Sequence, residues 1–347
     1  MKKLKLYKEN KIRFVIPLII LISSFFLSCA PNHCEDVPDT SNISLDIHVE
    51  RLDKKLSKIS SIQELKSLIA SNPELKDVFS AGQFPSDSIF YQEFYKILSD
   101  DHVDTVFQDV ENAFGDLSGL EAELEDAFKN LKFYYPNFSI PTIKTVASGF
   151  FSPDFYFTDS VIYIALDYFT GTKGHYPPPN EPEYIAKRYR KEYIVPIALR
   201  VLSTSLNATD VSDKTMLAEM IYWGKSYYFL NKILPCTPDS LLIGYTEKQL
   251  NASVANQERI WSHFVERQLL YETSHFIKTK YIGDRPYTAE ISSKAPGRIG
   301  QWLGWKIVNK YMEEKGDELN LQGLMAIKSA SKIFNESKFK PKDGEDL

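Results

Sequence analysis

The chain has 347 residues, of which 43% are hydrophobic and 25% are charged. This ordinary globular composition excludes a disordered, collagenous or disulfide-scaffold protein. The net charge is −5, but residues 1–28 contain six basic residues and one acidic residue, so the remainder has a net charge of −10. Because an acidic body repels phosphate backbones, we expect no nucleic-acid partner.

Residues 1–28 are predicted to be a secretory signal peptide. The six basic residues precede or border an apolar stretch from Phe14 to Leu27, which is shorter than the roughly 20 residues that span a membrane. The stretch ends in Phe26, Leu27, Ser28 and Cys29, and this segment resembles the lipobox of bacterial lipoproteins. Acyl chains such as palmitate on Cys29 would anchor the mature protein to a membrane outside the cytoplasm. The alternative is an uncleaved anchor that ends at a cysteine by chance.

Residues 29–41 are polar and contain prolines, which predicts a flexible tether. Cys34 and Cys236 are the two remaining cysteines. An oxidising compartment would let them pair, and the alternative is two free thiols, because the sequence gives no distance between them. The folded domain is expected to occupy residues 42–347.

Elements are predicted in chain order from the spacing of apolar residues. A half-buried strand is expected at residues 43–49 and two further strands at 142–149 and 160–169, the latter covered on both faces and joined to the former as a hairpin around Ser152 to Asp159. Helices are expected at residues 61–70, 85–99, 102–114, 117–131, 182–203, 213–232, 254–272, 297–314 and 322–337. The pattern predicts the α+β class, as a mostly helical single domain with a small N-terminal and central β-sheet.

Inspection for known motifs finds no catalytic set. None of the six histidines has the spacing of HExxH, and GxSxG, Walker and GxGxxG sequences do not occur. We therefore expect no cofactor, no metal site and no catalytic residue.

A basic run, Lys187, Arg188, Arg190 and Lys191, stands out in the acidic body. Such a run is neutralised by nearby glutamates, or else Arg188 and Arg190 contact an acidic protein partner or lipid headgroups.

The segment 296–312 suggests a second candidate contact. It is apolar around nearly the whole helix, which is typical of a buried helix, and the alternative is that Trp302 or Trp305 is exposed and contacts a partner. Arg298 in the first turn opposes the helix dipole, so it requires either a carboxylate in an internal ion pair or a ligand. Gly224 within a predicted helix indicates close packing.

Six segments in order are similar to the gliding-motility lipoproteins of the GldB type. They are YIALDYFTG (163–171), PEYIAKRYRKEYIVP (182–196), MIYWGKSYYFLNKILP (220–235), IGYTEKQ (243–249), NQERIWSHFVERQLLY (256–271) and PGRIGQWLGWKIVNKYM (296–312). This resemblance implies an outer-membrane lipoprotein facing the periplasm, needed for gliding and linked to the type 9 secretion machinery, with no established catalysis.

A more distant resemblance is to zincin-type peptidases, which carry HExxH on one helix and a glutamate ligand on the next. In this alignment HExxH corresponds to residues 191–195, and the glutamate corresponds to Trp223. Lys191, Val195 and Trp223 then occupy the ligand positions, and none of them suits zinc. Glu192, in the place of the general base, would have no metal-bound water to activate. The resemblance implies a zincin-like arrangement with a degenerate metal site, and the alternative is a packed helix without this ancestry.

The expected function is therefore non-catalytic docking to other envelope proteins of the gliding and type 9 secretion machinery by a lipid-anchored protein. The alternatives are a metallopeptidase with unrecognised ligands and a surface lipoprotein that binds glycans or peptides.

Overall fold

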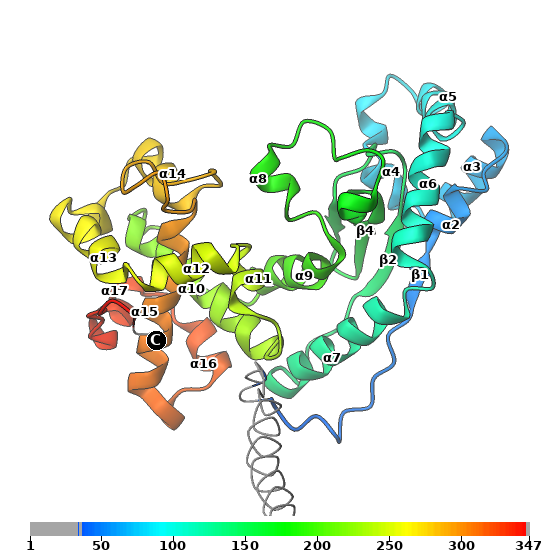
Figure 1. Ribbon diagram of the computed structural model, residues 1–347. Helices are drawn as coiled ribbons and strands as arrows, with labels where there is room; N and C mark the ends of the chain where they lie inside the picture. Colours follow the sequence, from blue (N-terminus) through cyan, green and yellow to red (C-terminus); the bar gives the residue numbers. More distant parts are fainter. Residues whose placement is uncertain (1–33, 35–36, 345–347) are drawn as a thin grey trace, which may run out of the picture.

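A computed structural model describes Cys34 and residues 37–344. The predicted signal peptide and Cys29 lie outside the described residues. Figure 1 shows the β-sheet and helices α2 to α6 on one side of the molecule and α13 to α17 on the other, with α9 and α11 between them. The α+β class is confirmed, because the described chain is mostly helical and has one small mixed sheet.

Four short strands form this sheet in the order β1-β2-β4-β3. The strands are β1 (Val49–Arg51), β2 (Thr142–Val146), β3 (Phe155–Phe157) and β4 (Val161–Ala165). The predicted strand at 43–49 is wrong in extent, because pairing begins only at Val49. The predicted hairpin is also wrong: β2 and β4 run parallel, and β3, in the segment taken as a turn, pairs antiparallel with β4.

Strand β4 is covered on both faces, as its apolar sequence predicts. Val161, Tyr163 and Ala165 belong to a core cluster with the helices that follow β1, whereas Ile162 and Ile164 belong to the larger cluster. The helices of this part are α2 (Leu52–Leu56), α3 (Ile62–Ser71), α4 (Leu75–Val78), α5 (Asp87–Leu98), α6 (Asp101–Phe114) and α7 (Ser118–Tyr134).

Short and long helices make up the second part. They are α8 (Glu183–Ala186), α9 (Ile194–Ser203), α10 (Met216–Ile233), α11 (Asp239–Ile243), α12 (Glu247–Val254), α13 (Gln257–Glu266), α14 (His275–Ile282), α15 (Ile299–Lys315), α16 (Leu321–Ala326) and α17 (Ala330–Ser337). The single helices predicted at 254–272 and 322–337 are each interrupted, the first after α13 and the second between α16 and α17.

The helix predicted at 182–203 is also interrupted. After α8 the chain makes an isolated β-bridge between Arg190 and Thr170, forms a 3₁₀ turn, η4 (Lys191–Tyr193), and only then enters α9. Pro196 is the third residue of α9, where its missing N–H costs no helical hydrogen bond, so Pro196 stands in the first turn of a helix rather than kinking a longer one.

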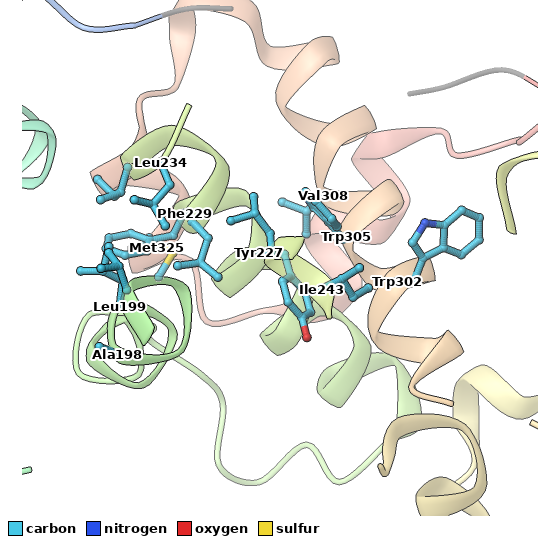
Figure 2. Packing of buried hydrophobic residues seen from close by; sticks show 14 of the residues in the cluster. Ala198, Leu199, Tyr227, Phe229, Leu234, Ile243, Trp302, Trp305, Val308 and Met325 are labelled. Carbon is cyan, nitrogen blue, oxygen red and sulfur yellow. The ribbon is translucent and has the colours of Figure 1, made fainter. Parts of the chain in front are cut away.

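The centre of the second part is the crossing of α10 and α15. A Cβ atom added at Gly224 would collide with the backbone of Gly304, and one added at Gly304 would collide with the carbonyl group of Met220. The close packing predicted at Gly224 is therefore confirmed. Around this crossing, Tyr227 and Trp305 lie with ring centroids 5.4 Å apart, and Figure 2 shows both among the buried side chains of the cluster.

Candidate functional site

A cavity of about 170 Å³ lies where α8, α9, α11 and the start of α15 meet. We call it the arginine pocket, because Arg188, Arg200 and Arg298 line it together with one shared carboxylate, that of Asp284. The other lining residues are Asp154, Ile185, Tyr189, Tyr193, Pro196, Ile197, Leu241, Leu242, Ile243 and Gly244.

Arg298 is the most deeply buried of the three arginines, with 4% of its surface exposed. Its backbone is left-handed (φ 59°), at the residue that precedes α15. The guanidinium donates to the carbonyl oxygen of Ile243 at 2.5 Å, and its Nε lies 3.2 Å from Oδ1 of Asp284. The carboxylate that the sequence requires for Arg298 is therefore present as an ion pair, in which the arginine is buried and the side chain of Asp284 is 47% exposed.

Gly244 allows two arginines to approach the end of α11. Its φ of 70° is in the left-handed region, and an added Cβ would lie 2.8 Å from Cδ of Arg188 and 3.0 Å from Nη2 of Arg298. A side chain at this position would displace both arginines, so the glycine is a requirement of the pocket.

One carboxylate serves two of the guanidinium groups. Nη2 of Arg188 lies 2.7 Å from Oδ1 of Asp284, the same oxygen that faces Arg298. Burial acts to raise the pKa of Asp284, but Arg298 and Arg188 outweigh it and hold the pKa below its usual value. Burial and the neighbouring charge of Arg298 lower the pKa of Arg188. The pocket thus holds positive charge that its own carboxylates only partly compensate.

Arg200 of α9 has a different environment. Its guanidinium lies 5.8 Å from the ring centre of Trp223, and within the described ranges it makes no ion pair. Arg200 is therefore the guanidinium of the pocket with the most unused hydrogen-bonding capacity.

The basic run of the sequence is divided among separate partners. Lys187 pairs with Glu183 at 2.8 Å and Arg190 with Glu192 at 3.2 Å, as local neutralisation predicts. Arg188 instead points to Asp284, nearly a hundred positions away in the sequence. Arg188 and Arg190 therefore do not form one continuous surface patch.

Trp302 and Trp305 lie in the core, with exposed fractions of 0% and 1%. A contact with a partner requires an exposed side chain, and in this structure both residues are instead buried: Trp305 packs against Tyr227 of α10, whereas Figure 2 shows Trp302 pointing from α15 away from α10.

The positions aligned with a zincin site are distributed over three environments. Lys191 and Glu192 belong to η4, Val195 is fully buried in α9, and Trp223 lies on α10 beside Arg200. No cluster of three or more His, Cys, Asp or Glu side chains suited to a metal ion occurs in the described part of the chain. The zincin ancestry stays a prediction.

Lys191 and Glu192 line a second pocket, of about 400 Å³, with residues 113, 114 and 116–120 and Glu123 of α7. We call it the acidic groove. Burial, together with repulsion from Glu192, raises the pKa of Glu123 to about 7. Nothing in the sequence around Glu123 indicates this burial, so the residue was not predicted as part of a site.

Cys34 and Cys236 form a disulfide, with an S–S distance of 2.13 Å. The sequence left this pairing open. Cys236 lies three residues beyond the end of α10, so the disulfide joins the predicted tether to the helical part of the molecule.

Comparison with known proteins gives one match. A family model described as gliding motility protein GldB matches residues 33–341. The chain belongs to the GldB family. No curated protein and no solved structure matches it. Among the described residues, none of the helices has the length and apolar character needed to cross a bilayer.

The GldB-family match includes every residue of the arginine pocket and of the acidic groove. Sequence reasoning singled out Arg188 and Arg298 but missed Arg200, Asp154, Gly244 and Asp284. Gly244 stands in the IGYTEKQ segment that resembles the family, and this was its only signal, whereas nothing in the sequence around Asp284 indicates its arginine partners.

Proposed function

We propose that this protein is a lipid-anchored, non-catalytic component of the envelope machinery for gliding and type 9 secretion, which docks to other proteins of that machinery. The observation that carries the proposal is the GldB-family match over residues 33–341. Anchoring by lipid would confine the protein to a surface and raise its effective concentration near partners on the same surface.

The disulfide supports a location outside the cytoplasm and a short distance from the lipid. Disulfides persist in oxidising compartments, of which the periplasmic side of the outer membrane is one. The five residue steps from Cys29 to Cys34 span at most about 18 Å of extended chain. With Cys34 joined to Cys236, the C-terminal end of α10 would stay within about that distance of the membrane.

A complementation experiment tests the proposal. Deleting the gene should abolish spreading of gliding cells, and the wild-type gene should restore it. A Cys29→Ala variant should incorporate no labelled palmitate and fail to restore spreading, because it lacks the acylated cysteine. As a matched control, Cys34→Ser should still incorporate the label, since it removes the disulfide and leaves the lipidated residue.

Normal spreading of the deletion strain would contradict the docking role in gliding. Incorporation of labelled palmitate by Cys29→Ala would contradict the anchor at Cys29. Chelator-sensitive peptide cleavage by the purified wild-type protein would favour the metallopeptidase alternative instead.

A further inference from the structure

The arginine pocket has one more positive side chain than negative side chains, so one additional negative group would make it neutral. Three guanidinium groups face two carboxylates, those of Asp284 and Asp154. Both oxygens of Asp154 are already engaged, Oδ1 by the backbone N–H of Phe155 at 2.9 Å and Oδ2 by the hydroxyl of Tyr189 at 3.1 Å. Asp284 forms ion pairs with Arg188 and Arg298, whereas Arg200 forms none among the residues that the structure describes, although its charge also helps to lower the pKa of Asp284.

The position of the pocket adds to its positive potential. It lies at the N-terminal end of α15, a helix of 17 residues with no acidic residue in its first turn. The helix dipole is positive at this end and favours a bound anion. Arg298, held there with 4% exposure, adds a full charge to the partial one.

We propose that the arginine pocket binds one carboxylate of a partner polypeptide, with Arg200 as the principal donor and Arg188 and Arg298 as supporting charges. Guanidinium groups match carboxylates through paired N–H donors. One bound carboxylate would make the pocket neutral. A phosphate dianion, together with Asp284 and Asp154, would give the pocket a net negative charge.

Apolar side chains beside the guanidinium groups suit a peptide better than a bare ion. Ile185, Ile197 and Leu241 line the same cavity, so an aliphatic group next to the carboxylate would be covered. The volume of about 170 Å³ admits one side chain or one chain terminus rather than a folded element. That the carboxylate belongs to a polypeptide rests on the docking role proposed above, while the preference of the pocket for a carboxylate stands on its own geometry.

Two pairs of small probes distinguish the sources of the carboxylate. N-acetyl-leucine represents a chain terminus and N-acetyl-leucinamide is its neutral control; N-acetyl-glutamic acid α-amide represents an acidic side chain and N-acetyl-glutamine amide is its control. Binding to the full-length lipidated protein in detergent is followed by thermal unfolding and by tryptophan fluorescence, because Trp223 lies 5.8 Å from the Arg200 guanidinium. For probes of this size we expect a Kd of about 1 mM for at least one acid.

Variants assign the binding to the pocket. Arg200→Gln should weaken binding of the acid probe about 10-fold or more, as expected for the loss of a charge-assisted hydrogen bond. Arg200→Lys keeps the charge but loses the paired donors, so it should bind with intermediate affinity and serves if Arg200→Gln does not fold. Arg267→Gln, which replaces an exposed arginine outside the pocket, should bind as the wild type does.

Four outcomes would overturn the inference. They are no binding of either acid at tens of millimolar, equal binding of acids and amides, unchanged binding in Arg200→Gln, and tighter binding of inorganic phosphate than of both acids. Because these measurements use purified protein, they can succeed where the gliding role fails, and the reverse.

Discussion

The arginine pocket and the acidic groove share the segment from α8 to α9, yet the first has an excess of positive side chains and the second an excess of negative ones. Arg188 and Arg200 line a pocket in which three guanidinium groups face two carboxylates. Only a few residues away, Lys191 and Glu192 line a groove in which a glutamate is held above its usual pKa. One basic run in the sequence thus serves two sites, and net charge along the chain does not reveal which neighbours each residue meets.

The largest effect on stability should come from adding a side chain at Gly244, where Arg188 and Arg298 lie close to the backbone. Gly244→Ala should destabilise the protein by about 2–4 kcal/mol, because the added Cβ combines left-handed strain with collisions at Arg188 and Arg298. Gly171→Ala is the matched control: φ is 66° there, but the nearest atom to an added Cβ is Cγ of Arg190 at 3.4 Å, so we expect about 1 kcal/mol.

Urea denaturation of the two alanine variants and the wild type measures this difference. Equal losses at Gly244 and Gly171 would show that the arginines move aside freely, and the account of a tightly held pocket would then be wrong.

A smaller effect, of opposite sign, is expected in the acidic groove. The pKa of Glu123 rises from 4.5 to about 7 on folding, so the folded state favours the neutral acid. Its contribution to stability is fully present below about pH 4.5 and is lost as the pH rises to 7. Glu123→Gln should therefore be more stable than the wild type at pH 8, by about 1–2 kcal/mol after allowance for partial exposure, and equal to it near pH 4.5.

Unfolding titrations at both pH values check this expectation, with Glu93→Gln, an exposed glutamate of α5, as the control. If Glu123→Gln gained nothing at pH 8, burial would not be holding the proton. Asp284 behaves in the opposite way, because its pKa is lowered on folding. Its contribution to the free energy of unfolding is present at neutral pH and is lost as the pH falls below its usual pKa.

The sequence predicts those parts of the fold that depend on local periodicity. The long helices α5, α6, α7, α10 and α15 follow from the spacing of apolar residues, and Gly224 indicated close packing, although not that its neighbour is Gly304 of α15. The break between α8 and α9 was missed because it coincides with the bridge from Arg190 to Thr170, a contact that the sequence does not reveal; Pro196 in the first turn of α9 was a local sign of the helix start. The strand order was missed because β2 and β4 pair in parallel with β3 between them in sequence.

The sequence indicated single residues of the candidate site but not which of them meet in the fold. Arg298 was expected to need a carboxylate, and Arg188 was expected to meet a negative group, but Asp284 as their common partner depends on contacts between distant segments. No periodic pattern encodes such a meeting, since it is produced by the packing of α8, α11 and α15.

The central claim is that this GldB-family protein works by receiving a partner through the arginine pocket. The most direct test is the spreading of cells in which the chromosomal gene carries Arg200→Gln, with Arg267→Gln as the control strain. The account predicts that both variants reach normal abundance in the membrane fraction and that only Arg200→Gln cells fail to spread. Full spreading of Arg200→Gln cells would contradict it.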